Sequence, residues 1–398
     1  MKKKNKDIFL LCKKRNLLCI FFTLALIISF FIMHNKRYEE ETTSKEKALE
    51  KPSDMISWKT TGISKYNGNY HFVTNSKDKK YYYLTKTNNK GELIFYKKLD
   101  GMAHLFRLNK NKSNEIRYTY FYCPETDNIN YICVDQTGLV VLNENYEEID
   151  TVNSINNIDG HDYIYVDDYD YIFQTNDFSS LEVGGENIEI MCSLIKEIKK
   201  GKEQIIFNSC NHKKMYYFLD KSMFDEIGPN YNYLHFNSFV IDPKDNNILV
   251  SYKNISSVIK INRKTGNIMW ILGGKLDQFG LSKKQLFINQ HAIKLEEDGT
   301  ILIYDNGDEI RNSRILEIKI DEKKKKIMKY ESYNLDGVTT GIWGNATLLN
   351  KKKKTFLVDY GIGGNADRPD FEEINFKTGK IDFSINFPNQ VVTNIYKG

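Results

Sequence analysis

The chain has 398 residues, of which 41% are hydrophobic, and it contains 26 tyrosines, 23 phenylalanines and only six prolines. This composition supplies enough apolar surface for a sizeable core, favours strands, and argues against long disordered regions. The formal net charge is +5, but seven lysines and arginines lie within the first fifteen residues, so the remainder is close to neutral. Nucleic-acid binding is therefore not indicated.

The N-terminus carries a signal for membrane topology. A basic tail at 1–16 precedes LLCIFFTLALIISFFIM at 17–33, which is long enough, at about 1.5 Å per helical residue, to span a bilayer core. No A-x-A cleavage site follows, so we expect an uncleaved transmembrane signal anchor, with a cleaved secretory signal as the alternative. The positive charge predicts a cytoplasmic tail, and hence a single-pass protein of the cell membrane whose body is extracytoplasmic.

After the anchor, residues 34–57 are charged and polar, and we expect a stalk there, followed by a folded body at 58–398. The body contains four cysteines in a compartment that we expect to be oxidising. The simplest disulfides join near neighbours, Cys123 with Cys133 and Cys192 with Cys210, because each pair brackets a plausible hairpin. A zinc site is the alternative, but no C-x-x-C motif or matching histidine spacing supports it.

The body repeats one strand pattern. NNILVSYKN, GTILIYDNG and KTFLVDYGI align without gaps, and their apolar triplets begin at Ile248, Ile301 and Phe356, at intervals of 53 and 55 residues. A second marker, IN-x-KTG-x-I, occurs from Ile261 and again from Ile374. Repeats of about 40 to 55 residues made only of strands and polar turns are typical of β-propeller blades.

Working back along the chain gives six units. They begin at His71, His104, His161, His235, His291 and Asn345, with weaker matches for the first two. The sequence thus predicts an all-β fold, a six-bladed β-propeller preceded by an N-terminal transmembrane helix.

The histidines at the starts of these units are candidate functional residues. Equivalent positions of successive blades are related by rotation about one axis, so His161, His235 and His291 are expected to converge at one end of the channel. Three polar residues flank them where groups that line the channel would lie: Asp162, Asn237 and Gln290. Two alternatives stay open. The histidines could tie each inner strand to the next blade, or three imidazoles could hold zinc or copper, although no carboxylate or cysteine is in phase with them.

Two stretches resemble a known family. The run LHFNSFVIDPKDNNILVSYKNISSVIKINRKTGNIMWILGG at 234–274, followed by QHA and DGTILIYDNG, closely resembles the bacterial arylsulfate sulfotransferases, and DGHDY at 159–163 resembles an earlier histidine motif of that family. The resemblance implies a six-bladed propeller of the bacterial envelope that moves a sulfuryl group from a phenolic sulfate to another phenol. It implies no cofactor and no nucleotide sulfate donor.

The resemblance also assigns roles to residues. It implies that His291, in the QHA motif, is the nucleophile that becomes transiently sulfated. His161, His235 and Asn237 would then surround the sulfuryl oxygens and the bridging oxygen, which fits what these side chains can do chemically.

One position departs from the family pattern. The family has an arginine eighteen residues after the histidine of its L-H-x-N motif, and Lys253 stands there in this chain. Lysine keeps the charge but loses the planar fork that grips two oxygens at once. Arg311 and Arg314 are candidates to supply a guanidinium from a neighbouring blade, and surface or strand-edge positions are their alternative interpretation.

We therefore expect a membrane-anchored, extracytoplasmic sulfotransferase that acts on a small aryl sulfate and a phenol and binds no nucleic acid. One alternative is a catalytically inactive propeller that binds an anionic or aromatic ligand, or a protein partner, at the cell surface; Lys253 is its main support. Another alternative is a metal-dependent hydrolase or oxidase.

Overall fold

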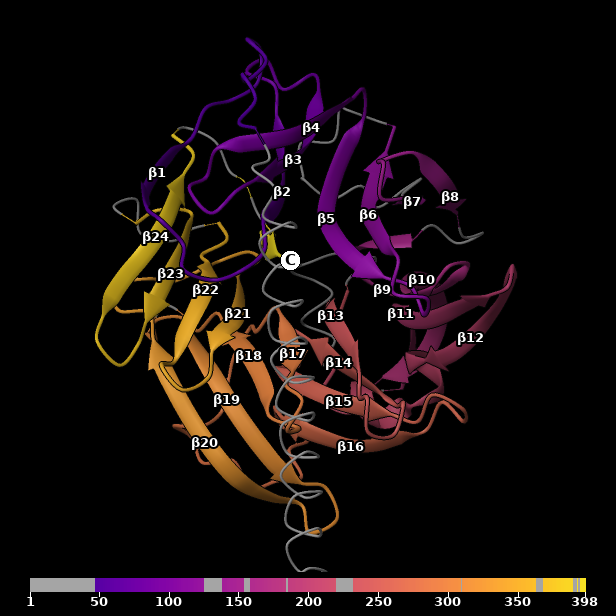
Figure 1. Ribbon diagram of the computed structural model, residues 1–398. Coiled ribbons are helices and arrows are strands. Elements are labelled where there is room, and N and C mark those ends of the chain that lie inside the picture. The colour runs from indigo at the N-terminus through magenta and orange to yellow at the C-terminus, as the bar shows by residue number, and fades with distance from the viewer. Residues whose placement is uncertain are drawn as a thin grey trace, which may run out of the picture. The chain divides into compact units, whose positions relative to one another are not determined.

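The computed structural model describes residues 47–124, 138–153, 158–183, 185–219, 232–308, 310–362, 368–388, 392 and 394–398. The chain divides into two compact units, Met1–Ala48 and Leu49–Gly398, and all the described strands belong to the second. Within this unit six antiparallel sheets surround a common centre (Figure 1). The predicted six-bladed β-propeller is confirmed.

The first three sheets, numbered here as blades 1 to 3, come from the N-terminal half. Blade 1 contains β2 (Tyr70–Asn75), β3 (Tyr82–Thr87) and β4 (Leu93–Leu99). Blade 2 contains β5 (Met102–Lys110), β6 (Ile116–Cys123), β7 (Gly138–Leu142) and β8 (Glu148–Val152). Blade 3 contains β9 (Ile158–Asp167), β10 (Asp170–Val183), β11 (Glu186–Lys199) and β12 (Lys202–Asn208), followed by the short 3-10 helices η1 (Ser209–Asn211) and η2 (Lys213–Tyr216).

Blades 4 to 6 are more regular. Blade 4 contains β13 (Phe236–Ile241), β14 (Ile248–Tyr252), β15 (Ser257–Ile261) and β16 (Ile268–Gly273). Blade 5 contains β17 (Ile293–Leu295), β18 (Ile301–Asp305), β19 (Arg314–Asp321) and β20 (Lys326–Asn334). Blade 6 contains β21 (Asn345–Asn350), β22 (Thr355–Asp359), β23 (Phe371–Asn375) and β24 (Lys380–Asn386).

Both ends of this unit take part in closing the ring. The C-terminal strand β25 (Tyr396–Lys397) pairs with β2 and forms the innermost strand of blade 1, and β1 (Lys59–Gly62) pairs with β24 as a fifth, outermost strand of blade 6. His71 consequently lies on the second strand of its blade, so its prediction as the start of an inner strand is wrong. Its ring is fully buried and packs against the rings of Phe106 and Tyr118.

The repeated sequence pattern marks the second strand of each blade. All residues of β14, β18 and β22 are buried. They are buried because each blade packs against its neighbours on both faces; for example, Val258 and Trp270 of blade 4 share an apolar cluster with Ile303 of blade 5. This packing is favourable because burying apolar surface stabilises the fold by about 25 cal/mol per Å². The sequence repeats therefore mark the strand that every blade buries.

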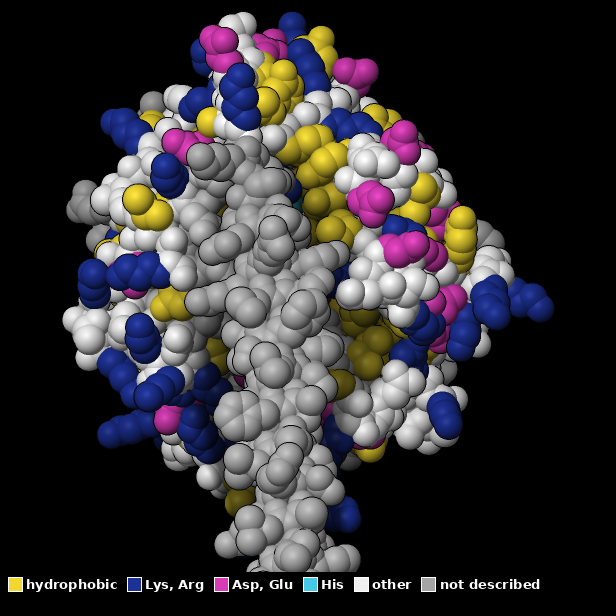
Figure 2. All heavy atoms as spheres, viewed as in Figure 1, with side chains coloured by type: hydrophobic (Ala, Val, Ile, Leu, Met, Phe, Trp, Pro, Cys, Tyr) yellow, Lys and Arg dark blue, Asp and Glu magenta, His cyan; other side chains and the backbone are white. Residues whose placement is uncertain are grey.

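The charged surface matches the near-neutral composition of the body. Acidic and apolar side chains lie among the basic ones on the face drawn in Figure 2. The lysine runs at 323–326 and 351–354 fall at the hairpin turns that follow β19 and β21.

One of the two predicted disulfides lies within the described residues. Cys192 on β11 is bonded to Cys210 in η1, with Cα atoms 5.4 Å apart. Cys123 is buried and disulfide-bonded. Cys133 lies outside the described residues, so its pairing stays a prediction.

The predicted tail at 1–16, the anchor at 17–33 and residues 34–46 of the stalk also lie outside the described residues. Within the part of the chain that the structure describes, no helix is long and apolar enough to cross a membrane. Towards the end of the predicted stalk, Met55 forms a β-bridge with Ser76 next to blade 1, and Ile56 is buried.

Candidate functional site

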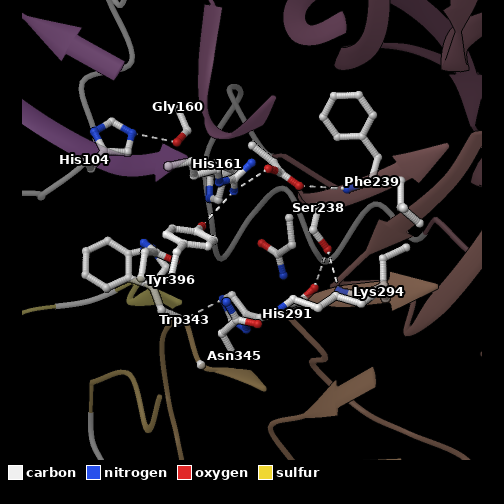
Figure 3. Close-up of a pocket in the computed structure, with 18 residues that line it drawn as sticks. His104, Gly160, His161, Ser238, Phe239, His291, Lys294, Trp343, Asn345 and Tyr396 are labelled. Atoms are coloured by element: carbon white, nitrogen blue, oxygen red, sulfur yellow. Dashed lines mark hydrogen bonds and ion pairs between the residues drawn. The ribbon is translucent and has the colours of Figure 1, made fainter. Parts of the chain in front are cut away.

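The inner strands of the blades converge on a cavity of about 250 Å³. All six blades, or the residues leading directly into them, contribute to its lining, and the polar lining side chains are His104, Arg107, His161, Asp162, Asn237, Ser238, His291, Lys294, Trp343, Asn345, Asn394 and Tyr396. Figure 3 shows several of these side chains around one space. Two of the three predicted catalytic histidines, His161 and His291, therefore share one cavity, together with Asn237.

A repeated backbone conformation turns side chains into this cavity. Five residues at the entrances of inner strands have φ between 50° and 63°: Leu105, His235, Asn289, Trp343 and Asn394. Two positions after each of them comes a residue that lines the cavity: Arg107, Asn237, His291, Asn345 and Tyr396. Positive φ is unfavourable for residues other than glycine, so its recurrence marks equivalent positions.

This repeat corrects the predicted phase of the histidines. The position in blade 4 that is equivalent to His291 is Asn237, and His235 instead occupies the left-handed position that Asn289 fills in blade 5. An alignment of the units by sequence matches histidine with histidine, because histidine is rare in this chain. The backbone conformation instead matches His291 with Asn237.

His291 is held as a neutral imidazole with a defined tautomer. The Asn306 side-chain amide donates from Nδ2 to the carbonyls of Thr340 (3.1 Å) and Trp343 (2.7 Å), which leaves its Oδ1 to accept from Nδ1–H of His291 at 2.9 Å. The lone pair of His291 therefore lies on Nε2, where it accepts a hydrogen bond of 3.0 Å from the Trp343 backbone amide. Burial lowers the pKa of His291 to about 3, and the positive charge of Lys253 acts in the same direction.

The surroundings of His161 shift its pKa in the opposite direction from that of His291. Its Nδ1 donates to Asp159 Oδ1 at 2.6 Å, and the backbone amide of His161 donates to the same oxygen at 2.9 Å. Burial lowers the pKa of His161, but the charge and hydrogen bond of Asp159 outweigh that effect, so its pKa is raised above the ordinary value of 6.5. Asp159 also accepts a hydrogen bond from Asn176, and its own pKa is lowered despite burial.

His235 and Lys253 adjoin the cavity. The ring of His235 meets the ring of His161 edge to face, with centroids 5.1 Å apart. Burial lowers the pKa of His235 to about 3, assisted by the charges of His161 and Lys253. The Lys253 backbone amide donates to the His235 carbonyl at 2.8 Å, so the two segments are joined. Within the described residues no carboxylate pairs with the half-buried Lys253 ammonium, whose pKa is lowered by burial.

Of the three polar residues predicted to line the channel, two line the cavity and one does not. Asp162 lines the cavity and forms a 2.7 Å ion pair with Arg107. Asn237 also lines it, donates from Nδ2 to the Gln290 carbonyl at 2.8 Å, and leaves a buried Oδ1 without a partner. The prediction for Gln290 is wrong. This side chain is fully buried beside β14 and β15, and its Nε2 donates to Ser251, Tyr252 and Ser257.

A comparison with protein families matches the arylsulfotransferase (ASST) model to residues 56–397. The chain belongs to the arylsulfotransferase family. Its similarity to the arylsulfate sulfotransferase AssT of Escherichia coli O6:H1 (strain CFT073) is 27% identity over 214 residues, which cover 41% of this chain and 35% of that protein. The chain thus spans about a third of the length of this curated relative.

Solved structures add only weak similarity. A protein of unknown function from Bacteroides caccae has a TM-score of 0.49 and 12% identity, covering 83% of this chain and 98% of that chain. A chain of a nidogen/laminin complex has a TM-score of 0.45 and 8% identity, covering 83% of this chain and 97% of that chain.

Among the lining side chains that the sequence did not predict, three are charged or phenolic: Arg107, Lys294 and Tyr396. Arg107 donates to the Tyr163 carbonyl (2.9 Å) and to the Tyr396 hydroxyl (2.7 Å). Lys294 donates to the Thr347 hydroxyl, and burial lowers its pKa to about 8. Aligning the units on their histidines could not identify Arg107, because the residue of blade 2 at the position of His291 is Arg107, two after the left-handed Leu105, and not His104. Nothing in the sequence indicated Tyr396, which reaches the cavity because the C-terminal strand β25 pairs with β2 in blade 1.

Neither candidate guanidinium for the family's arginine position reaches this cavity. Arg314 pairs with Asp305 at 2.7 Å and donates to the Leu286 carbonyl, so it is structural. Arg311 lines a different pocket, between blades 4 and 5. Within the residues that the structure describes, no three His, Cys, Asp or Glu side chains are grouped so that they could hold a metal ion.

Proposed function

We propose that this chain moves a sulfuryl group from an aryl sulfate to a phenol through a transiently sulfated His291. The observation that carries the proposal is the contrast between two histidines of one cavity. His291 is neutral with its lone pair on Nε2, and His161 is biased towards its protonated form by Asp159. A nucleophile and an acid with separated pKa values are what a group transfer with a poor leaving group requires.

In the first half of the reaction Nε2 of His291 attacks sulfur and the sulfur–oxygen bond to the aryl group breaks. The electron pair goes to the aryl oxygen, which takes the Nε2 proton of His161. The Trp343 backbone amide, which donates to His291 Nε2 before the attack, then donates to a sulfuryl oxygen. Asn306 holds Nδ1–H of the sulfated ring.

In the second half an acceptor phenol replaces the first product. The phenol gives its proton to His161, and its oxygen attacks sulfur. The nitrogen–sulfur bond breaks, and its electron pair returns to Nε2 of His291. His161 ends protonated, as it began, so the cycle balances without a cofactor.

Lys253 supplies positive charge to this chemistry. Its ammonium lacks a carboxylate partner among the described residues and acts on His161, His235 and His291 together. Its single charge attracts the sulfate, but it cannot donate the two parallel hydrogen bonds that a planar guanidinium donates to two sulfate oxygens. We therefore expect activity with weak sulfate binding.

The test uses the purified full-length chain with 4-nitrophenyl sulfate, with and without added phenol. We expect release of 4-nitrophenol that depends on the acceptor, transfer of radiolabelled sulfur to the protein when the acceptor is omitted, and loss of both in His291→Asn. Absence of turnover with a panel of donors and acceptors, or unchanged turnover in His291→Asn, would refute the mechanism.

The second candidate function is a catalytically inactive propeller that binds an aryl sulfate or another organic anion, and Lys253 in place of the family's arginine favours it. Saturable binding of radiolabelled 4-nitrophenyl sulfate without transfer of label to position 291 would support this candidate and exclude the first.

We also propose that residues 17–33 anchor the chain in the cell membrane with the propeller outside the cytoplasm. The apolar segment and the positive charges before it support this placement. In cells that carry a C-terminal epitope, we expect the epitope in the membrane fraction and open to added protease. A protected epitope, or release into the soluble fraction, would contradict the placement.

A further inference from the structure

A second pocket, larger than the catalytic cavity, lies between blades 4 and 5. Its volume is about 600 Å³, within the range of small-molecule binding sites. No residue lines both pockets. The second pocket can therefore be tested independently of the reaction.

One wall of the pocket is formed by apolar side chains. Met215, Phe218, Tyr233, Leu276 and Phe287 line it, and three of these (Met215, Tyr233 and Phe287) are buried. Flat rings and a flexible thioether form a surface suited to an aromatic or other rigid apolar body.

The charged residues of this lining are all of one sign. Arg311, Lys275 and Lys283 line the pocket, and no carboxylate of the described ranges does. Lys275 and Lys283 are exposed, and the Lys275 ammonium lies 4.9 Å from the centre of the Phe218 ring. The pocket thus combines an apolar wall with an excess of positive charge.

Arg311 is the residue that most needs a ligand. Its Nη1 donates to the Leu286 carbonyl at 2.7 Å, but Nε and Nη2 are buried and have no hydrogen-bond partner among the residues that the structure describes. These two nitrogens lie on one edge of the guanidinium, which is the edge that grips two oxygens of one anion. Leaving two buried N–H groups of a cation unpaired is unfavourable.

The backbone fixes the position of Arg311. Its amide donates to Asp308 Oδ1 at 2.8 Å, closing a tight turn. Gly307 has φ 75°, and a Cβ there would lie 2.1 Å from the Arg311 carbonyl oxygen, so only glycine fits. The guanidinium is therefore presented by a constrained turn.

We propose that this pocket binds an organic anion that has a rigid apolar body and a carboxylate, sulfonate or sulfate group. The anionic group accepts from Nε and Nη2 of Arg311, and the body packs on the wall formed by Tyr233 and Phe287. Three of its lining segments continue into catalytic ones: Tyr233 precedes His235, Ile255 follows Lys253, and Ile288 precedes His291. The site is thus adjacent to the catalytic cavity and separate from it.

The probe is 8-anilinonaphthalene-1-sulfonate, whose sulfonate is attached through carbon and cannot be transferred. The matched neutral probe is N-phenyl-1-naphthylamine, which keeps the aromatic body without the anion. With the full-length chain, we expect Arg311→Met to weaken binding of the sulfonate about tenfold and to change binding of the neutral probe less than about twofold. Arg311→Lys should recover part of the loss.

Three controls locate the site. Lys352→Met removes an exposed positive charge elsewhere and should change nothing. His291→Asn and Lys253→Met alter the catalytic site and should leave binding of the sulfonate intact. Equal affinity of Arg311→Met and wild type for the sulfonate, or loss of binding in His291→Asn alone, would overturn the proposal.

A second measurement applies if Arg311→Met does not fold. Ile255→Cys adds a thiol to the pocket wall, and peptide mass spectrometry follows its modification by a maleimide at position 255. Saturating sulfonate should slow this modification at least about fivefold. An unchanged rate would reject the site.

Discussion

The two pockets of this propeller differ in kind. The candidate active-site cavity, of about 250 Å³, contains His161 and His291 with pKa values moved in opposite directions. The second pocket, of about 600 Å³, is lined by no histidine and no carboxylate among the described residues, and its charged side chains are those of Lys275, Lys283 and Arg311. The first is therefore equipped to move protons, and the second is equipped only to hold an anion.

The difference follows from where each pocket lies. The cavity lies at the centre of the ring, where five of the six blades contribute a residue at a repeated backbone position and blade 3 contributes His161 and Asp162, so diverse side chains meet. The second pocket is lined mainly by η2 and by connecting segments around blades 4 and 5, so its lining does not use the repeated position that brings titratable side chains to the centre of the ring. The predictions below separate the two.

The largest effect is expected for His291→Asn. The variant keeps a polar side chain but loses the nucleophilic nitrogen, so kcat should fall about a thousandfold or more. Initial rates with 4-nitrophenyl sulfate and phenol measure this. A fall of less than tenfold would show that His291 is not the nucleophile. Sulfonate binding to the second pocket should not change.

A smaller effect is expected at Lys253. Lys253→Met removes the uncompensated charge beside the three histidines, and we expect KM for the aryl sulfate to rise about tenfold. Lys253→Arg supplies a side chain that can donate to two sulfate oxygens at once. It should lower KM several-fold and raise kcat/KM. If both variants match wild type in KM, the position does not contact the sulfate.

Asp159→Asn should shift the pH dependence. In wild type the charge of Asp159 raises the pKa of His161 against the effect of burial, so the protonated form persists above pH 6.5 and is lost as the pH rises through the raised value. Without that charge the proton is lost at lower pH. The alkaline limb of kcat/KM should therefore move to lower pH, with a several-fold loss of rate at neutral pH. A limb that does not move would exclude His161 as the acid.

The smallest effect is expected at the rim of the second pocket. Lys283 is exposed, so its attraction for the bound sulfonate is screened by water and ions. We expect Lys283→Gln to weaken binding about twofold at low salt and not measurably at high salt. A loss as large as that of Arg311→Met would mean that the anion lies at the rim.

Much of the architecture could be predicted because it repeats. The triplets at Ile248, Ile301 and Phe356 correctly predicted strands, and the structure shows that each is the second strand of its blade, which is buried on both faces. The pairing of Cys192 with Cys210 followed from their nearness along the chain.

The errors arose where residues distant in sequence meet. His71 was placed at the start of an inner strand, but β25 from the C-terminus takes that place. Gln290 was expected in the channel, although its amide is needed to bind β14 and β15. His235 was aligned with His291 on residue type, whereas the backbone conformation aligns Asn237 with it.

The sequence by itself determined the repeat, the number of blades and a family resemblance that includes His161, His235, His291 and Asn237. It could do so because strand periodicity and scarce residue types are local properties of the chain. The tertiary structure alone decided which nitrogen of His291 carries the lone pair, since that depends on Asn306 and Trp343 from two other segments. It alone decided that Asp159 favours protonated His161, and that Arg311, beside a separate pocket, has two buried N–H groups without partners among the described residues, because pKa values and unpaired donors depend on what surrounds a group in space.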